Sequence, residues 1–129
     1  MYKEEELTRK LIGVAMAVHR EIGPCYPEHV YHRAMIIALG QENLLFEIEK
    51  EIDIYFRNNL ITNFRLDLVV ENKVVIELKA VVGEMPNIFK MQTISYLKAS
   101  GIEVGLLVNF GNDSLEVKRL ARYHEYSKK

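Results

Sequence analysis

The chain lacks several features that would assign it to a familiar class. Its 129 residues contain a single cysteine, Cys25, so neither a disulfide framework nor a cysteine-based zinc ribbon can form. No apolar run approaches the roughly eighteen residues that a membrane-spanning helix needs. The N-terminal residues are mostly charged and include no hydrophobic region of a signal peptide. We therefore expect a cytoplasmic protein with no membrane partner.

An excess of charge of either sign is also missing. The 17 Lys and Arg residues nearly balance the 18 Asp and Glu residues, which leaves a net charge of -1 at pH 7 with histidine neutral. Non-specific nucleic-acid binders usually carry a strong basic excess, so this balance disfavours that class. It does not exclude an enzyme whose acidic metal site offsets a local basic rim. Neither a glycine-rich phosphate loop nor a Ser-His-Asp order is visible.

The composition does provide enough apolar material for a core. Hydrophobic residues make up 49% of the chain and charged residues 27%, which excludes a disordered protein. The length suits one domain, and no internal repeat or linker divides it. We therefore expect a single domain over residues 1–129.

Two helices and then a set of strands are expected along the chain. Apolar residues at helical spacing predict a helix over residues 4–22, which Gly23 and Pro24 end. A second helix is expected from about Pro27 to Gly40. Period-two alternation over residues 46–56 then predicts a strand with one buried face and one acidic face. Strands over residues 61–70 and 74–80 complete an antiparallel meander.

The sequence of the second half of the chain predicts a helix that connects two parallel strands of the sheet. Pro86 can open a helix whose apolar stripe would be Ile88, Met91, Ile94 and Leu97. The almost wholly apolar residues 102–110 resemble a central strand, which a right-handed crossover would pair in parallel. Residues 115–120 are expected to form an edge strand or a short helix. The fold class is therefore α/β (α+β), in the order αα-βββ-α-β, with a mixed central sheet flanked by helices.

Chemistry is concentrated on two neighbouring strands. Alternation places Arg65 and Asp67 on one face of their strand, and Glu77 and Lys79 on one face of the next. If the strands are hairpin neighbours, Asp67 and Glu77 lie side by side. Two close carboxylates repel unless a cation or a shared proton lies between them, and hard oxygen ligands suit Mg²⁺ or Mn²⁺.

The apolar face opposite these charged side chains is expected to consist of Leu66, Leu68, Ile76 and Leu78. A Glu-x-Lys pattern is weak evidence alone, because Glu116 and Lys118 repeat it in the polar C-terminal part. The Glu-x-Lys pattern at Glu77 differs from the other one in two ways. It lies in a hydrophobic strand, and the strand before it contains Asp67. The alternative is a solvated strand face with ordinary charge pairs.

Asp67 with Glu77-Leu78-Lys79 resembles the motif of the PD-(D/E)XK nuclease superfamily, with Leu66 in place of the proline. The segment from Gln92 to Tyr96 resembles the Q-x-x-x-Y motif of RecB-type nuclease domains. From about residue 7 to residue 110 the chain is also similar to the GxxExxY family, which is grouped with these nucleases. The landmarks are residues 18–24, Glu28-His29-Val30-Tyr31, Arg65-Leu66-Asp67, Glu77-Leu78-Lys79-Ala80, residues 92–96 and residues 105–110.

The resemblance implies a restriction-endonuclease-like core and a metal-dependent nuclease. By that resemblance, Asp67 and Glu77 would bind Mg²⁺ or Mn²⁺, with the Leu78 carbonyl as a further ligand. Lys79 would orient or activate the attacking water, and Glu28 would complete the acidic cluster or hold a metal-bound water. The implied partner is nucleic acid, DNA in preference to RNA.

Substrate-positioning residues follow from the same resemblance. Gln92 and Tyr96 would share one helix face and position the substrate or Lys79. Arg65 would contact phosphate, although pairing with Asp67 or a neighbouring strand is an equal alternative. Gln92 and Tyr96 could equally form an ordinary amphipathic boundary. Glu28 near the start of a helix would also be stabilised by the helix dipole, whether or not it has a role in catalysis.

Other residues of the N-terminal half have simpler interpretations. Tyr31 is expected to be a packing residue. His29 and His32, with Cys25 and Glu28 nearby, offer a zinc site as an alternative, although their spacing matches no established zinc signature. His19 is expected near a helix C-terminus, where a partly charged imidazole is favoured, or facing the site.

One position departs from the family pattern. The GxxExxY motif would place a glycine at position 25, where a positive φ is permitted, and this chain has Cys25. Pro27 also replaces a residue that is usually aliphatic. The loop before Glu28 is therefore expected to be reshaped.

Three functions fit these patterns. The first is the metal-dependent nuclease-like domain. The second is a non-catalytic binding or assembly module on the same fold, and the third is a small-molecule phosphodiesterase. An exposed edge strand at either end of the sheet could pair across a twofold axis, so a homodimer is one expected assembly.

Overall fold

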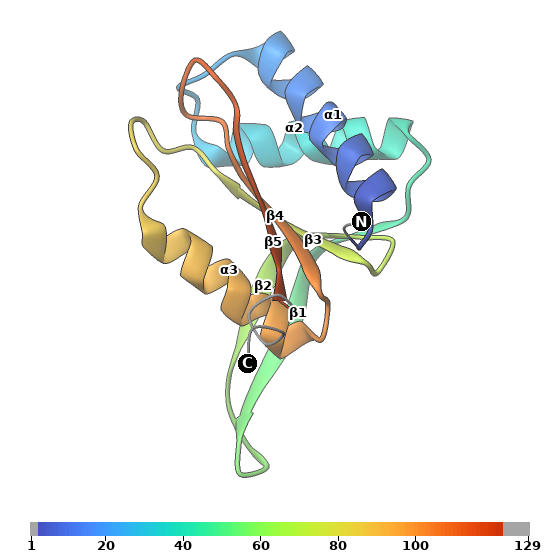
Figure 1. Ribbon diagram of the computed structural model, residues 1–129, viewed down its shortest axis with the longest axis vertical. Coiled ribbons are helices and arrows are strands. Elements are labelled where there is room, and N and C mark those ends of the chain that lie inside the picture. Colours follow the sequence, from blue (N-terminus) through green and yellow to red (C-terminus); the bar gives the residue numbers. More distant parts are fainter. Residues whose placement is uncertain (1–2, 123–129) are drawn as a thin grey trace.

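The computed structural model describes residues 3–122, which form three helices and five strands (Figure 1). The order begins as expected with two helices, three strands, a helix and a strand, and a fifth strand follows. The helices are α1 (Glu5–Ile22), α2 (Glu28–Gln41) and α3 (Asn87–Ser100). The strands are β1 (Phe46–Phe56), β2 (Asn59–Val70), β3 (Val74–Lys79), β4 (Val104–Asn109) and β5 (Glu116–Ala121).

The five strands make one mixed sheet in the order β1-β2-β3-β4-β5. Strands β1, β2 and β3 form the expected antiparallel meander, and β3 pairs in parallel with β4 after the crossover through α3. The segment that could have been a strand or a helix is an edge strand, β5, antiparallel to β4. The predicted α+β class with a mixed central sheet is thus confirmed.

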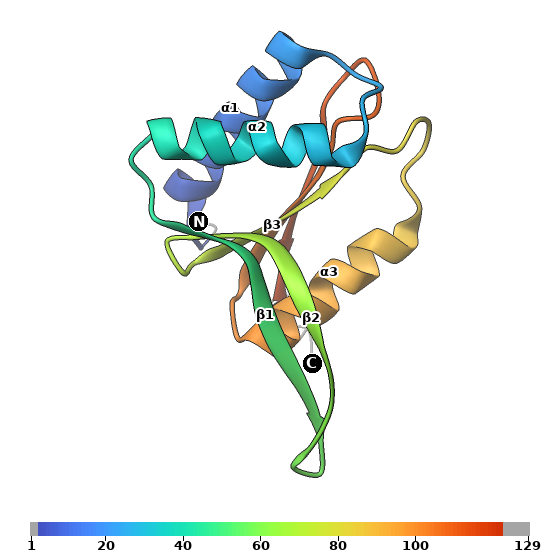
Figure 2. The ribbon, with the colours of Figure 1, turned by 180° about the vertical axis from the view of Figure 1, so that it is seen from behind.

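Helices cover both faces of the sheet. One apolar cluster joins α1 and α2 to inward-facing residues of β2, β3 and β4. The second cluster joins α3 to the opposite face and includes Leu97. Figures 1 and 2 show α1 and α2 together on one side and α3 on the other. Within residues 3–122, no helix combines the length and the hydrophobicity that crossing a bilayer requires.

The end of the β1–β2 hairpin projects beyond the helices that flank the sheet (Figure 2). The expected buried face of β1 is for this reason only partly correct. Ile52 and Ile54 are half-buried, but the exposed fractions of Ile48 and Phe56 are 45% and 57%. Alternation along a strand predicts which side chains share a face, but not whether another layer covers that face.

Strand β2 is continuous, but Leu66 and Leu68 pack on opposite faces of the sheet. Leu68 packs in the cluster under α1 and α2, together with Ile76 and Leu78, whereas Leu66 packs in the cluster under α3. The expectation that all four leucine and isoleucine side chains share one face is wrong for Leu66. Glu49, on the neighbouring strand, has a left-handed backbone with φ 49°, and both strands curve in this region (Figure 2).

Helix α3 is rotated relative to the expected stripe. Ile88 and Met91 are 56% and 54% exposed, whereas Thr93 and Leu97 are buried. The prediction for Ile88 and Met91 is therefore wrong. Thr93 can be buried because its hydroxyl donates to the carbonyl oxygen of Phe89 at 2.9 Å within the helix. A search for apolar periodicity cannot detect a buried position that is occupied by threonine.

Candidate functional site

The carboxylates of Asp67 and Glu77 lie side by side at the place where β2 and β3 separate. Backbone pairing between these strands ends at Leu68 and Ile76. Beyond it, the Asp67 N–H donates to Glu77 Oε2 at 2.9 Å, and the Leu78 N–H donates to Asp67 Oδ2 at 2.8 Å. The two carboxylates thus accept hydrogen bonds from the Asp67 and Leu78 N–H groups, which would otherwise lack a partner because the β2–β3 backbone pairing has ended. The predicted adjacency of Asp67 and Glu77 is confirmed.

Burial makes this acid pair difficult to ionise. Glu77 is 5% exposed, and its pKa is raised to about 8, first by burial and then by the charge of Asp67. Burial also raises the pKa of Asp67, against the opposing effect of the hydrogen bond from the Leu78 N–H. A buried and a half-buried carboxylate that interact this strongly are stable only with a proton or a cation between them.

Lys79 brings a positive charge to the same end of β3. Its ammonium nitrogen lies 4.4 Å from the centre of the Phe89 ring, which is a cation–π contact. Its charge lowers the pKa of Glu28, Asp67 and Glu77, so it is within electrostatic reach of all three. Among the described residues, Lys79 closes no ion pair with a carboxylate. The ammonium group is therefore available to a ligand beside the acid pair.

Glu28 reaches the site from the first turn of α2. Burial raises its pKa, and the charge of Asp67 raises it further, while Lys79 lowers it. Tyr31 fixes this end of the helix: its ring stacks on Phe110 at 4.6 Å, and its hydroxyl donates to the Gly23 carbonyl oxygen at 2.6 Å. Tyr31 is thus the packing residue that the sequence predicts.

The loop before Glu28 adopts the backbone that a glycine would favour. Cys25 has φ 71°, in the left-handed region that residues with a Cβ adopt only at a cost. Its Sγ lies 3.7 Å from the Gly111 carbonyl oxygen. Position 25 therefore has the left-handed backbone that a glycine would favour, although a cysteine occupies it.

His32 lies one turn after Glu28 and faces the acid pair. Its Nε2 is 3.3 Å from the Asp67 carbonyl oxygen, and its charge lowers the pKa of both Glu28 and Asp67. From the sequence, His32 is expected only as part of a zinc site. The signal that could have found it is its i, i+4 spacing from Glu28, which places both side chains on one helix face.

The histidine alternatives are not supported. No three His, Cys, Asp or Glu side chains within residues 3–122 are gathered closely enough to hold a metal ion, so the zinc site at His29, His32, Cys25 and Glu28 is wrong. His19 does not face the acid pair. Its Nε2 lies 2.8 Å from the Asn112 carbonyl oxygen and its ring packs near Phe110.

Within residues 3–122, two carboxylates, and not three, are close enough together to bind a metal at this site. Glu28 does not join Asp67 and Glu77 in a closed three-carboxylate cage. The two paired carboxylates remain, and each uses one oxygen for a backbone N–H and keeps the other. A buried acid pair with a raised pKa and oxygen donors fits a hard divalent cation such as Mg²⁺ or Mn²⁺.

The predicted substrate-binding residues are brought together only in part. Burial and the charges of Glu77 and Asp67 raise the pKa of Tyr96, which places its hydroxyl within electrostatic reach of the pair. Gln92, one turn earlier on α3, is exposed. Arg65 is also exposed, lies opposite Glu51 on β1, and forms no ion pair with Asp67 within the described residues.

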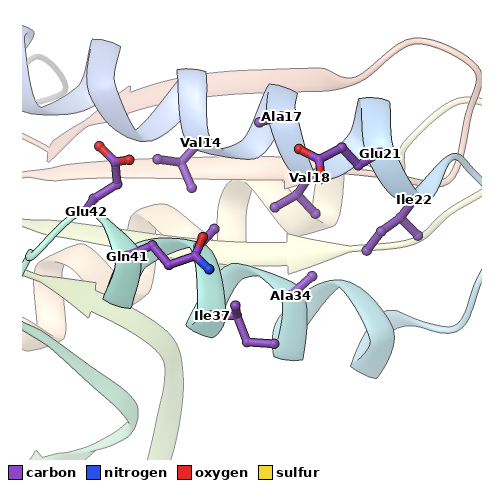
Figure 3. Close-up of a pocket in the computed structure, with 10 residues that line it drawn as sticks. Val14, Ala17, Val18, Glu21, Ile22, Ala34, Ile37, Gln41 and Glu42 are labelled. Atoms are coloured by element: carbon purple, nitrogen blue, oxygen red, sulfur yellow. The ribbon is translucent and has the colours of Figure 1, made fainter.

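A separate pocket of about 330 Å³ lies between α1 and α2, with Glu21, Gln41 and Glu42 among its lining residues (Figure 3). Its walls include Val14, Val18, Ala34 and Ile37, and no predicted site residue lines it. The pocket is therefore separate from the acid pair and contains none of the predicted catalytic or metal-binding residues.

A mixed sheet whose second and third strands bring an aspartate beside a Glu-x-Lys segment defines a restriction-endonuclease-like domain. The sequence profile described as "PD-(D/E)XK nuclease superfamily" matches residues 5–120, and the chain belongs to that superfamily. It is also similar to a solved structure titled "Crystal structure of SSO0001", with 25% identity and a TM-score of 0.59. That match covers 72% of this chain and 48% of the other, so this chain spans about half its length. A comparison with curated proteins gave no match.

Proposed function

We propose that this domain is a metal-dependent nuclease that hydrolyses phosphodiester bonds in nucleic acid, with DNA in preference to RNA. The observation that carries the proposal is the pair of half-buried Asp67 and buried Glu77, with the Lys79 ammonium within electrostatic reach. A bound Mg²⁺ or Mn²⁺ would supply charge neutralisation at the phosphate and a lowered pKa of bound water. In the superfamily to which the chain belongs, this arrangement suits phosphodiester hydrolysis.

The residues divide into two groups by role. Asp67 and Glu77, with the Leu78 carbonyl as a third oxygen donor, hold the cation. Lys79 orients the attacking water and stabilises negative charge on the phosphate. Glu28 then holds a water at the edge of the site, because it lies outside the close pair.

A second set of residues acts on the substrate. Tyr96, whose pKa is raised in part by the charges of Glu77 and Asp67, positions a scissile phosphate or Lys79, and Gln92 extends the same helix face. Arg65 contacts a phosphate farther along the strand. We further propose that the chain is a GxxExxY protein, on the landmarks around Glu28 and Tyr31, and that it works in the cytoplasm.

The test combines metal binding with cleavage. Mg²⁺ and Mn²⁺ are titrated by calorimetry into the wild type and Asp67→Asn, which keeps an oxygen for the Leu78 N–H. Labelled single- and double-stranded DNA and RNA are then added to both and to Lys79→Ala. We expect metal binding to be lost in Asp67→Asn, and cleavage to be lost in both variants.

The chain provides its own matched control. Glu116 and Lys118 repeat the Glu-x-Lys pattern on β5 and form an exposed ion pair at 3.8 Å. Lys118→Ala removes the same side chain from the same pattern without touching the acid pair, so its cleavage rate is expected to equal that of the wild type. Cleavage retained in both Asp67→Asn and Lys79→Ala would refute the assignment.

The second candidate is a non-catalytic binding or assembly module on the same fold. The observation in its favour is that no three-ligand metal cage is formed among the described residues. This candidate predicts a folded protein that binds no Mg²⁺ or Mn²⁺ at millimolar concentration, with or without DNA. The calorimetric titration therefore separates it from the nuclease.

A further inference from the structure

Strand β5 is the last strand of the sheet, and within residues 3–122 no strand pairs with its outer edge. Its register with β4 is regular along all six of its residues. The Arg122 N–H continues this ladder by donating to the Glu103 carbonyl oxygen at 2.8 Å. Because the backbone groups of successive residues point to alternate sides of a strand, Val117 directs its N–H and C=O to the outer edge. Such an edge is a template for a further strand.

The opposite end of the sheet, β1, is a poorer template. Its acidic face would bring carboxylates opposite carboxylates if two copies of β1 paired antiparallel. The residues of this face are Glu47, Glu49, Glu51 and Asp53. The left-handed backbone of Glu49, with φ 49°, also leaves a gap in the register between β1 and β2. Like charges and an irregular backbone both disfavour the pairing of an edge with its own copy.

The charges of β5 are complementary to themselves. Val117 packs toward α1 and α2, and Leu120 packs toward α3. By alternation Glu116 and Lys118 therefore share the α3 face, where they form an ion pair at 3.8 Å. When a second β5 runs antiparallel with its Val117 opposite this one, each Glu116 lies opposite a Lys118 of the other copy.

Other registers of the same two strands lose this match. A shift that places Glu116, Lys118 or Arg119 opposite its own copy brings like charges together. In the register centred on Val117, Arg119 lies opposite Leu115 of the partner. The Arg119 guanidinium is engaged within its own chain, by the Lys3 carbonyl oxygen and the Thr8 hydroxyl. The charge pattern therefore favours one register.

A groove runs beside the same edge on the α1 face. Its volume is about 530 Å³, and its lining residues include the apolar Ile12, Met16, Leu115 and Val117 as well as the polar Arg20 and Ser114. Met16 is 51% exposed. Because a twofold axis at Val117 would relate the two copies, each groove would lie next to the same groove of its partner. Exposed apolar side chains beside a strand edge are typical of an interface between chains.

We propose that two copies of this chain pair through β5, antiparallel about a twofold axis at Val117, and join their two five-stranded sheets into one. The backbone groups of Val117 pair with those of the partner's Val117. A Glu116–Lys118 pair lies on either side of them on the α3 face, and the two grooves meet on the α1 face.

The interface is separate from the acid pair, because β4 lies between β5 and the strands that carry Asp67 and Glu77. The inference therefore goes beyond the proposed nuclease function and does not depend on it. For the same reason, Lys118→Ala remains a control for cleavage.

The test exchanges the two charges and measures association by sedimentation equilibrium, at chain concentrations from about 1 µM to about 1 mM. Lys118→Glu places four carboxylates around the axis, and Glu116→Lys places four ammonium groups there. Each single variant should therefore dimerise at least about tenfold more weakly than the wild type. Mixed in equal amounts, the two variants should form a heterodimer, because each glutamate then lies opposite a lysine again. The double variant Glu116→Lys/Lys118→Glu should dimerise as the wild type does.

Lys50→Glu is the matched control for charge reversal. Lys50 lies on the other edge strand and also pairs within its strand, with Glu47 at 3.1 Å. Its reversal should leave the dissociation constant unchanged. Heterodimer formation by the mixed variants also shows that each single variant is folded.

The register is tested by disulfide formation in a Cys25→Ala background, with oxidised glutathione as the oxidant. Val117→Cys should give a covalent dimer, because the Cα atoms of a hydrogen-bonded antiparallel pair are about 5.5 Å apart and a disulfide spans about 4.4–6.8 Å. Ala121→Cys should give none, since residue 121 would lie opposite residue 113 and about 27 Å from its own copy.

Four results would each overturn this inference. They are a wild type that stays monomeric at the highest concentration, single charge variants that dimerise as tightly as the wild type, a mixture that forms no heterodimer, and a covalent dimer of Ala121→Cys but not of Val117→Cys. The first would leave the edge to a strand of another protein, which needs main-chain hydrogen bonds but no match between Glu116 and Lys118. Neither metal nor nucleic acid is present, so failure of the nuclease assignment would not alter these measurements.

Discussion

Glu77 accepts a hydrogen bond from the backbone of Asp67, the residue whose charge most opposes its own ionisation after burial. This hydrogen bond therefore links the two strands and at the same time brings two carboxylates close enough to repel each other when both are ionised. Either a proton or a cation can remove this repulsion. The two cases differ in how the stability of the protein depends on pH and on metal.

The stability of the metal-free protein should fall as the pH rises from 4.5 to about 8. The pKa of Glu77 is raised from 4.5 to about 8, so between these values the folded chain holds a proton that the unfolded chain has lost. The free energy of unfolding therefore declines across this window, by on the order of a few kcal/mol. Urea denaturation at a series of pH values measures it.

Glu77→Gln is the control for this pH dependence, because it keeps an oxygen for the Asp67 N–H and cannot ionise. Its unfolding free energy should change much less across the same window. At pH 8, added Mg²⁺ should stabilise the wild type and not the variant. Parallel pH profiles for the two proteins would show that Glu77 is ionised in the folded state throughout.

Tyr31→Phe should destabilise the N-terminal half and disturb the loop before Glu28. The Tyr31 hydroxyl donates to Gly23 and accepts from the Tyr26 N–H at 3.2 Å. Its removal leaves both backbone groups without this partner, at a cost of about 1–3 kcal/mol. Thermal unfolding measures this loss. An unchanged melting temperature would mean that water replaces the hydroxyl.

Cys25→Gly should stabilise the protein by about 0.5–1 kcal/mol. Relief of the left-handed backbone at φ 71° is worth about 1–2 kcal/mol, and the greater freedom of glycine in the unfolded chain removes about half of that. Cys25→Ala keeps the Cβ and should give no such gain in urea denaturation. Equal stabilities of the two variants would show that residue 25 carries no backbone strain.

Gly111→Ala should be strongly destabilising, by about 3 kcal/mol or more. A Cβ at this position would lie 2.2 Å from the carbonyl oxygen of Val81, which is backbone and cannot move aside. Gly13 offers the opposite case, because it is exposed within α1 and a Cβ there meets nothing within 4 Å. Gly13→Ala should stabilise by about 1 kcal/mol, measured in the same denaturation series.

The parts of the fold that could be predicted from sequence are those set by local chemistry. Period-two alternation and turn residues locate the meander, and they alone bring Asp67 beside Glu77. The packing of Leu66 and Leu68 on opposite faces could not be predicted, because alternation along a strand places residues i and i+2 on the same face. His32 was missed because its role depends on how α2 packs against β2.

The strand order of the sheet has a consequence for how the chain folds. Each strand pairs with the strand that precedes it in sequence, so no strand must wait for a distant segment to be made. Only the β3–β4 pairing spans a helix, and the other closures need only short connections. Topologies with such local pairings reach the native state quickly. During synthesis on the ribosome, each new strand would therefore emerge next to a partner that is already in place.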